Sequence, residues 1–347
     1  MNRAQMMTVT GKQPGMVRTG QFCRNSSSVN SASTGRDMYK VTVAIVTFRS
    51  QAELPECLES ILASDIPVKV VIIDNDSKDG TLELAQAYAE KHSNVIAFSS
   101  GGNIGLAAAN NLVMPHVESE YVLMLNPDTV ARRNTISRML AIMEADPEIG
   151  VVGPKNVYGD GQCFSSYQRT WNLWHVFAWR VVPYSLTRTF YDRCSRYNES
   201  EVFYVSGSCL LIRAKLFQEI NGYDPAFFLT IEDVCDLCRR VRDRGYRVIF
   251  TPRTEIVHHC SRSGDQVPVL AILSGYKGSI YYFKKYNGWV GGVSAYLIVT
   301  FGCAVKIVIS LLKVLMFRRN RDQQTLKVYC QILPQLLRRG PSIAHTG

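Results

Sequence analysis

The chain alternates twice between a buried strand and a helix near its start, and this alternation restricts the fold more than any other feature. Residues 41–48 (VTVAIVTF) and 68–73 (VKVVII) are rich in β-branched side chains, as expected of strands buried on both faces. Apolar residues at helical spacing fill residues 50–62, and a second helical segment covers residues 81–91. Strand, helix, strand, helix is a βαβ pattern, which predicts a parallel sheet and an α/β domain.

Polar stretches with acids and glycines follow the next strand ends. Residues 74–81 (DNDSKDGT) come directly after the second strand, where a carboxylate can accept a hydrogen bond from a base or a ribose hydroxyl. Turn formation explains several of these residues equally well. A third strand at residues 94–98 leads into residues 101–111 (GGNIGLAAANN), whose glycines either let the backbone approach a ligand or pack a helix tightly on a strand.

A fourth apolar run, residues 121–129 (YVLMLNPDT), delivers one acid at its end. The run breaks at Asn126 and Pro127, so Asp128 lies just past the carboxyl end of a predicted buried strand. Ligands of open α/β sheets bind at this edge, which places Asp128 well to hold a metal ion or a phosphate. The alternative is a turn with a solvated aspartate.

Aromatic residues and arginines are concentrated in residues 155–201, which show no regular period. Trp171, Trp174, Trp179 and Arg180 belong to this segment. Aromatic rings and guanidinium groups suit the recognition of sugar rings and phosphates. The same residues are equally typical of an interfacial belt near lipid.

Glu232 and Asp233 open a helix that we expect to run to about Arg244. Acids at this position stabilise a helix N-terminus through its dipole. An acid that points from the start of a helix into a pocket can also deprotonate a hydroxyl group. The residues alone leave both interpretations open.

His258 and His259 follow a short predicted strand at residues 247–250. The acids and thiols nearby lack the spacing of a zinc site, so a structural zinc is not predicted. One histidine could share a metal with Asp128, and a surface or core position is the alternative.

Several motifs, taken in order, resemble one enzyme family. The segments IVTF, IDNDSKDGT, GGNIGLAAANN and LNPDT are similar to the nucleotide-binding half of family-two glycosyltransferases with the GT-A fold. The segments GSCLLIR, NGYDPAFF, ED, RGYRVIF and then P-x-T-x-I-x-H are similar to the acceptor half of the same family. The likeness is greatest to the bacterial rhamnosyltransferase-type branch, and it spans about residues 41–263.

The resemblance implies a GT-A-type α/β fold, a Rossmann-like mixed sheet flanked by helices, over residues 39–265. Its nucleotide-binding half would be residues 39–130 and its acceptor half residues 131–265. Residues 1–38 are polar and lack periodicity, which predicts a disordered leader. Residues 266–347 are predicted to be a basic, apolar, helical extension that is associated with a membrane.

The donor side follows from the same resemblance, which places Thr47 and Asp74 against the nucleoside and Asn103 and Gly105 at the border of the donor pocket. The residues that we predict to bind the donor are Thr47, Phe48, Asp74, Asp76, Asn103, Gly105, Asn126 and Asp128. Asn126 stands where many members of the family have the first acid of their DxD motif, which leaves fewer charged metal ligands.

The resemblance also assigns the catalytic and metal-binding residues. Asp233 is expected to be the general base, and Asp128 and His258 are expected to bind Mg²⁺ or Mn²⁺, which oxygen and imidazole ligands suit. The residues predicted on the acceptor side are Glu232, Trp171 and Gly207. Asp236 lies one position later than the family pattern because Cys235 precedes it, so its place in the pocket is left open.

The net charge of +10 is concentrated at the two ends of the chain. From Lys277 onward there are eleven Lys and Arg residues and one acid, Asp322, around a long apolar stretch. Such an end suits an anionic membrane surface. Nucleic acid is not predicted as a partner, because the middle of the chain is acidic and contains no recognition motif. The ten scattered cysteines indicate reduced thiols in a cytosolic protein.

Residues 289–305 are uncharged and largely apolar, but they fall short of the roughly 20 residues that a membrane span needs. Lys306 and Lys313 follow on one helical face, so our first interpretation is an interfacial, monotopic helix with snorkelling lysines. A single span is the second interpretation and a buried core helix the third. We therefore expect the protein at the cytoplasmic face of the cell membrane.

The predicted reaction is an inverting, metal-dependent sugar transfer to a lipid-linked (polyprenyl-diphosphate) saccharide acceptor in surface polysaccharide synthesis. By resemblance, the nucleotide-sugar donor is dTDP-L-rhamnose. The alternatives are a UDP- or GDP-sugar donor and a non-catalytic nucleotide-sugar-binding scaffold at the membrane. A homo-oligomer is compatible with the sequence.

Overall fold

The computed structural model describes residues 39–163, 165–182, 198–259, 268–317 and 319–339, which all belong to one compact unit, Gly35–Gly347. The predicted disordered leader, residues 1–38, lies outside the described residues. The last part of the predicted membrane-associated region, residues 340–347, lies outside them as well.

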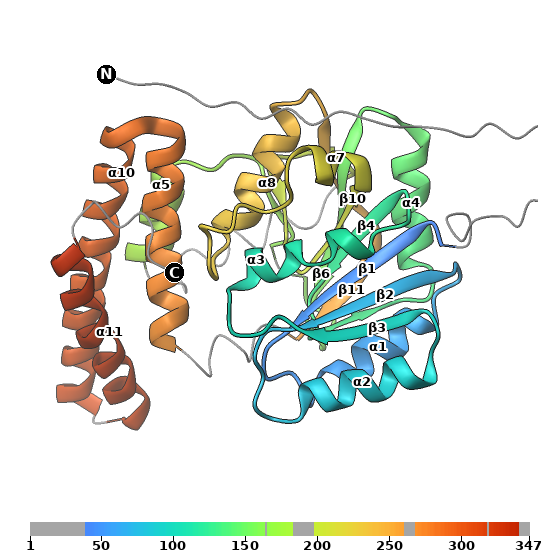
Figure 1. Ribbon diagram of the computed structural model, residues 1–347. Helices are drawn as coiled ribbons and strands as arrows, with labels where there is room; N and C mark the ends of the chain where they lie inside the picture. The colour runs from blue at the N-terminus through green and yellow to red at the C-terminus, as the bar shows by residue number, and fades with distance from the viewer. Residues whose placement is uncertain (1–38, 164, 183–197, 260–267, 318, 340–347) are drawn as a thin grey trace, which may run out of the picture. The chain divides into compact units, whose positions relative to one another are not determined.

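A nine-stranded mixed sheet organises this unit (Figure 1). Its strands follow the order β3-β2-β1-β4-β10-β6-β11-β5, and β8 pairs with β11. The first four strands in this order are parallel: β3 (Val95–Ser99), β2 (Val68–Asp74), β1 (Val41–Thr47) and β4 (Tyr121–Leu125). Their pairing confirms the predicted βαβ unit, and β1 and β2 end in register at Thr47 and Asp74.

The other half of the sheet contains both strand directions. β10 (Cys209–Arg213) runs antiparallel to β4 and to β6 (Ile149–Val157), whereas β11 (Arg247–His258) runs parallel to β6. The short strands β5 (Thr129–Ala131) and β8 (Ser200–Glu201) pair antiparallel with β11. A separate two-stranded sheet consists of β7 (Tyr167–Gln168) and β9 (Tyr204–Val205). This mixed sheet is the one that the sequence predicted.

Helices cover both faces of the sheet, because alternate strand residues point to opposite sides. The face that presents Val43 and Ile45 is covered by α1 (Leu54–Leu62), α2 (Thr81–Lys91) and α4 (Thr135–Ala145). The face that presents Ala44 and Val46 is covered by α3 (Leu106–Asn111), α7 (Ala214–Glu219) and α8 (Glu232–Arg242). A short 3-10 helix, η2 (Met114–His116), follows α3. Burial on both faces explains why the parallel strands are continuous apolar runs.

The C-terminal part of the described chain is helical (Figure 1). Within α10 (Pro268–Phe317), Gly288 has φ 65° and ψ −163°, so a turn divides α10 into two helical segments. α5 (Leu173–Val181) and α11 (Asn320–Arg339) pack against α10. The sequence predicted a helical extension over residues 266–347 with an apolar stretch in it, but it predicted neither the break at Gly288 nor α5.

The second segment of α10 is apolar and largely exposed. Within the described part of the chain, α10 is the one helix that is long and apolar enough to cross a membrane, and 28% of its most apolar stretch is buried. Its exposed apolar side chains include Trp289, Leu297, Phe301, Leu311, Leu312 and Leu315. An exposed apolar surface of this kind marks a contact site for lipid or protein.

β11 is longer than predicted, since the strand expected at residues 247–250 continues to His258. Its register against β6 shifts between Thr251 and Glu255, which accommodates Pro252 within the strand. The continuation carries His258 to the part of the sheet that pairs with β5.

The cysteines in the described part of the chain are free thiols, in agreement with the sequence-based expectation. Cys235 and Cys238 have the CxxC spacing, but both are buried within α8 and unbridged. Burial raises the pKa of both thiols, so they serve the core rather than redox chemistry.

Candidate active site

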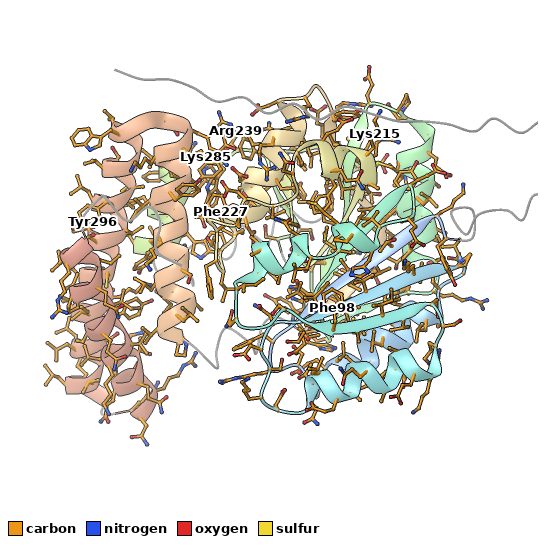
Figure 2. All side chains as sticks on the ribbon, in the orientation of Figure 1. Phe98, Lys215, Phe227, Arg239, Lys285 and Tyr296 are labelled. Carbon is orange, nitrogen blue, oxygen red and sulfur yellow. The ribbon has the colours of Figure 1, made fainter. Side chains whose placement is uncertain are left out.

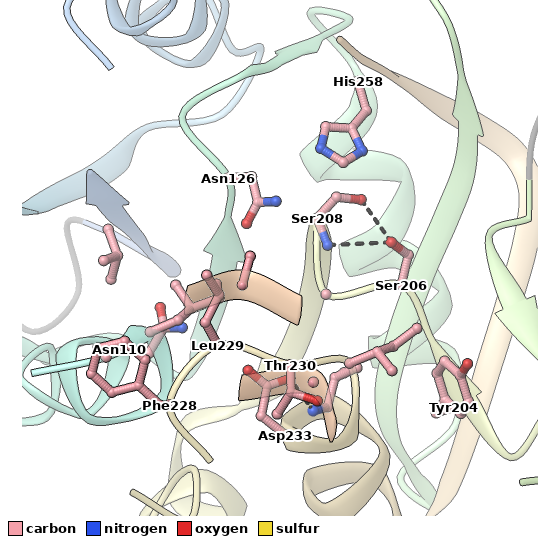
Figure 3. A pocket seen from close by; sticks show the side chains of 18 of the residues that line it. Asn110, Asn126, Tyr204, Ser206, Ser208, Phe228, Leu229, Thr230, Asp233 and His258 are labelled. Carbon is pink, nitrogen blue, oxygen red and sulfur yellow. Dashed lines mark hydrogen bonds between the residues drawn. The ribbon is translucent and has the colours of Figure 1, made fainter. Parts of the chain in front are cut away.

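A cavity of about 880 Å³ opens beyond the carboxyl ends of the parallel strands. Phe48 lines it after β1, Asn75 after β2, and Asp128 after β4. Figure 3 shows Asp233 at one side of this space and His258 at the other. The cavity thus lies at the sheet edge where proteins of this architecture bind their ligands.

Asp128 and His258 meet at this edge. Nε2 of His258 lies 3.2 Å from Oδ1 of Asp128, and the two side chains are 12% and 15% exposed, respectively. The pairing of β5 with β11 brings them together: His258 is the register partner of Thr129, and the amide of His259 donates to the carbonyl oxygen of Asp128 at 3.0 Å. The relative position of the two side chains is therefore set by the sheet.

This pair fits a divalent metal ion of the Mg²⁺ or Mn²⁺ type. One carboxylate and one imidazole can hold such an ion when phosphate oxygens and water supply the remaining ligands. Among the described residues, no group of three or more His, Cys, Asp and Glu side chains could hold a metal by itself. The donor set in this part of the chain is thus that of an ion shared with a substrate.

Asp233 reaches the cavity from the first turn of α8 (Figure 3). Its side chain is 5% exposed, and Oδ1 accepts a hydrogen bond from the amide of Val234 at 2.5 Å. Burial, together with the neighbouring carboxylates of Glu232 and Asp236, raises its pKa from 3.8 to about 8. A carboxyl group with this pKa is suited to accept a proton near neutral pH.

The two neighbouring acids of α8 face α10 instead of the cavity. Glu232 is fully buried, and its Oε1 accepts a hydrogen bond from the hydroxyl of Ser279 at 2.5 Å. Asp236 is fully buried as well and forms ion pairs with Arg240 at 2.7 Å and with Lys285 at 2.6 Å. Lys285 belongs to α10, and its side chain extends toward Asp236 of α8 (Figure 2). Glu232 therefore does not line the cavity, and its predicted role on the acceptor side stays a prediction, whereas Asp236 links α8 to α10.

Thr47 and Asp74 form a buried pair at the ends of β1 and β2. The hydroxyl of Thr47 donates to Oδ1 of Asp74 at 2.9 Å, and the amide of Ser77 donates to Oδ2 at 3.0 Å. Neither side chain lines the cavity, and Asp76 forms an ion pair with Lys78 at 2.5 Å outside it. Asp74 thus holds the turn after β2, and the contact of these residues with a nucleoside remains a prediction.

Asn75 lines the cavity although sequence reasoning gave it no role. Its Nδ2 donates to Oδ1 of Asn103 at 3.1 Å, and its Oδ1 accepts from the amide of Ile104 at 3.0 Å. These bonds fix the predicted donor-side turn against β2. The available signal was its position between the two acids Asp74 and Asp76, where turn chemistry explained it equally well.

Gly105 joins the donor side of the cavity to the loop that precedes Asp233. Its φ is +88°, and a Cβ at this position would lie 2.8 Å from the carbonyl oxygen of Phe228. The amide of Leu106 donates to that same oxygen at 2.6 Å. Glycine is therefore required here both by the backbone conformation and by the close approach.

The remaining predicted residues divide into two groups. Phe48, Asn103, Asn126 and Gly207 line the cavity. Trp171 does not; it is buried behind the wall. There it makes edge-on contacts with two lining residues, Trp179 and Tyr204, at ring-centroid distances of 6.0 and 5.8 Å. Trp171 thus supports the wall rather than forming it.

Other lining residues were not assigned from the sequence. The hydroxyl oxygens of Ser206 and Ser208, in the turn between β9 and β10, lie 2.9 Å apart (Figure 3). Arg180 lines the cavity from α5, and Lys306 lines it from the second segment of α10. Arg180 belongs to the aromatic and basic segment that the sequence singled out, whereas no local pattern connected Lys306 to the site.

Comparison with known proteins establishes the family. The family model described as Glycosyl transferase family 2 matches residues 42–221. The chain belongs to glycosyl transferase family 2. It is 30% identical over 267 residues to N-acetylglucosaminyl-diphospho-decaprenol L-rhamnosyltransferase of Mycobacterium tuberculosis, a match that covers 71% of this chain and 85% of that relative. Rhamnosyltransferase WbbL of Escherichia coli K12 is 25% identical over 230 residues, which cover 63% of this chain and 83% of that relative.

These relatives confirm the resemblance that the sequence motifs indicated, and the protein is a glycosyltransferase. Two solved structures agree in fold with this family-two enzyme. Mannosyltransferase PcManGT from Pyrobaculum calidifontis, in complex with GDP-Man and Mn²⁺, has a TM-score of 0.53 at 16% identity and is matched over 88% of each chain. GalNAc-T7 with UDP, GalNAc and Mn²⁺ has a TM-score of 0.50 at 16% identity, over 64% of this chain and 43% of that one.

Proposed function

We propose that this family-two glycosyltransferase transfers L-rhamnose from dTDP-L-rhamnose to a saccharide carried by a polyprenyl diphosphate, with inversion at the anomeric carbon. One observation supports the site above all: Asp128, His258 and Asp233, which are far apart in the sequence, line a single cavity. The substrates are supported by the mycobacterial relative, whose name states an N-acetylglucosaminyl-diphospho-decaprenol acceptor and a rhamnosyl group.

Asp233 is the proposed general base. The acceptor hydroxyl loses its proton to the carboxylate of Asp233 while its oxygen forms a bond to the anomeric carbon. The bond between that carbon and the nucleoside diphosphate breaks on the opposite face, so one displacement inverts the configuration. The pKa of about 8 lets Asp233 take up this proton and release it again near neutral pH.

Asp128 and His258 would hold Mg²⁺ or Mn²⁺ beside the donor diphosphate. When bound, such an ion neutralises the charge that develops on the leaving diphosphate. The pairing of β5 with β11 fixes the carboxylate and the imidazole, so little reorganisation is needed when the donor arrives. Phe48, Asn75 and Asn103, which follow β1, β2 and β3 respectively, line the same cavity and are the proposed contacts of the nucleoside and sugar.

The exposed apolar side chains of α10 suit the membrane on which such an acceptor is found. Leu311, Leu312 and Leu315 are exposed in the second segment, and Lys313 lies among them as a cation that can reach anionic headgroups. We propose that this segment attaches the enzyme to the cytoplasmic face of the cell membrane. The attachment brings the cavity close to lipid-linked substrates.

The test is a transfer assay with the full chain, Mn²⁺, polyprenyl-diphosphate-linked N-acetylglucosamine and one of three donors: dTDP-L-rhamnose, a UDP-sugar or a GDP-sugar. We expect product with dTDP-L-rhamnose, with the anomeric configuration opposite to that of the donor. Product formed only with a UDP-sugar or a GDP-sugar would show that the proposed donor is wrong, while the proposed active-site residues would stand. Binding of dTDP without transfer to any acceptor would favour a non-catalytic nucleotide-sugar-binding protein.

A further inference from the structure

One end of the cavity is lined by helices and carries positive charge. We call it the α5–α10 end, and its residues are Trp179, Arg180, Val182, Leu270, Ala271, Gly275 and Lys306. The two carboxylates that line the cavity, Asp128 and Asp233, do not belong to this group. The cavity therefore has an acidic part, which suits a metal ion and a general base, and a basic part. The proposed reaction gives the basic residues no role.

Arg180 is held in place by close packing against both segments of α10. Its guanidinium carbon lies 5.0 Å from the ring centroid of Tyr276, and a Cβ on Gly275 would lie 2.8 Å from Nη2. A Cβ on Gly302 would lie 2.9 Å from the carbonyl oxygen of Arg180. Lys306 follows Gly302 by one helical turn, so it lies on the same face of α10. Both residues therefore line the cavity where α5 packs against α10.

Within the described part of the chain, neither Arg180 nor Lys306 forms an ion pair with a carboxylate. Two partly buried cations give this part of the cavity a positive charge, which a bound anion would neutralise. A guanidinium group matches the oxygens of a phosphate with two parallel hydrogen bonds, and an ammonium group adds a compact charge. The chemistry of this end therefore suits a diphosphate.

Apolar residues line the same end of the cavity as the two cations. Leu270 and Trp179 are 38% and 44% exposed, and Ala271 and Val182 complete the lining. Inorganic phosphate or diphosphate gains nothing from such a surface, whereas a hydrocarbon chain next to the diphosphate does. The α5–α10 end thus suits a ligand in which an anionic group is joined to an apolar chain.

We propose that the α5–α10 end binds the diphosphate of a prenyl-diphosphate-linked acceptor through Arg180 and Lys306, and the first prenyl units through Leu270 and Trp179. The inference rests on the proposed function, because that function supplies the lipid-linked acceptor. The inference assigns recognition of the lipid diphosphate to residues that are different from those proposed to bind the sugar donor.

The experiment measures binding of farnesyl diphosphate to the full chain by calorimetry, with Mn²⁺ and saturating dTDP present so that the donor diphosphate site is filled. Arg180→Gln and Lys306→Gln should each raise the dissociation constant by about 10- to 100-fold, the effect of losing a charged hydrogen-bonding partner. Lys313→Gln is the matched control, because Lys313 is exposed on the same helix and does not line the cavity; it should stay within about twofold of the wild type.

A further variant retains the positive charge of Arg180 but displaces the guanidinium group. Gly275→Ala places a methyl group against the guanidinium of Arg180, so it should also weaken farnesyl diphosphate binding while circular dichroism shows a folded protein. Wild-type protein that does not bind farnesyl diphosphate, or equal binding by all variants, would overturn the proposal. Absence of rhamnosyl transfer with normal farnesyl diphosphate binding would instead contradict only the proposed reaction.

A lipid headgroup is the other source of a phosphate at this position. Co-sedimentation with vesicles of phosphatidylcholine and phosphatidylglycerol, without acceptor, distinguishes the two sources. We expect Arg180→Gln and Lys306→Gln to sediment like the wild type. Loss of vesicle binding in these variants, together with unchanged farnesyl diphosphate binding, would assign the cations to the membrane surface and overturn the acceptor site.

Discussion

His258 Nε2 lies 3.2 Å from Asp128 Oδ1, and the pairing of β5 with β11 holds the two side chains at that distance. Asp128 ends the turn after β4, whereas His258 ends a strand from the other half of the sheet. The proposed metal site therefore exists only when the two halves of the domain are assembled. Metal and donor binding should report on the integrity of the whole sheet.

Replacing either member of this pair should weaken donor binding only when metal is present. We expect Asp128→Ala and His258→Ala to raise the dissociation constant of dTDP in Mn²⁺ by about 10- to 100-fold, because a charge-assisted interaction is lost. Wild-type protein in EDTA should then bind dTDP as weakly as the variants. His259→Ala is the control, because His259 pairs with Glu56 outside the cavity. Calorimetry with and without EDTA makes the comparison, and a metal-independent loss would contradict the assignment.

Asp233→Asn should remove the base without removing the donor site. We expect kcat to fall by about 10²- to 10⁴-fold, the usual contribution of general base catalysis. Binding of dTDP should change little, because Asp233 is not among the proposed metal ligands. The rate of the wild-type enzyme should rise with pH until about pH 8, where the carboxyl group loses its proton. Weak dTDP binding with an unchanged kcat would show that Asp233 has a structural role.

The same substitution should stabilise the protein, increasingly so at higher pH. The pKa of Asp233 is raised from 3.8 to about 8, so between these values the folded protein holds a proton that the unfolded chain releases. Wild-type stability therefore falls as pH rises through this window and then levels off. Asp233→Asn lacks this penalty. Its advantage in Tm, measured by calorimetry, should be absent near pH 4, grow up to pH 8 and stay constant above it.

Asp236→Ala should destabilise the fold and leave the acceptor KM of the remaining folded enzyme unchanged. Asp236 is fully buried and pairs with Arg240 and Lys285, and removal of one partner from a buried ion pair costs about 3–5 kcal/mol. Glu219→Ala breaks the exposed pair with Lys215 and serves as the control, with an expected cost below about 0.5 kcal/mol. Urea unfolding measures both. A raised KM at wild-type stability would show instead that Asp236 contacts the substrate.

Substitutions at two glycines of one loop distinguish the cost of backbone strain from the cost of a steric clash. Gly101 and Gly105 have φ of +83° and +88°, but only at Gly105 would a Cβ meet other atoms, those of Phe228. Gly101→Ala should cost about 1–2 kcal/mol through strain alone. Gly105→Ala should cost about 1–3 kcal/mol more, because the contact with Phe228 must open. It should also raise the donor KM, whereas equal effects of the two substitutions would show that the close approach does not matter.

The parallel half of the fold was predictable because its signals are local. β1 and β2 are apolar runs that end in turn residues, and α2 occupies the predicted residues Thr81–Lys91. Asp128 could be singled out in the same way, since a strand end that is followed by one acid is visible without knowledge of any neighbour. The family motifs then connected Asp128 with Asp233 and His258.

Contacts between distant elements could not be predicted. β5 has three residues, too few to show a period, although its pairing with β11 builds the Asp128–His258 pair. α5 (LWHVFAWRV) is apolar on nearly all sides and therefore lacks the amphipathic pattern of a surface helix. The orientation of Glu232 toward Ser279 depends on the packing of α8 against the first segment of α10, and a contact between two distant helices has no local signal in the sequence.

The anchoring of α8 limits how a transferase of this design can acquire new acceptors. A bulkier acceptor cannot be admitted by sliding the helix, because such a shift would separate Asp236 from Lys285 and Glu232 from Ser279 at once. Adaptation is instead directed to α5 and to the turn that contains Ser206 and Ser208, where side chains can be exchanged while the proton acceptor stays in place. Chimeras between relatives should therefore trade these segments and keep α8.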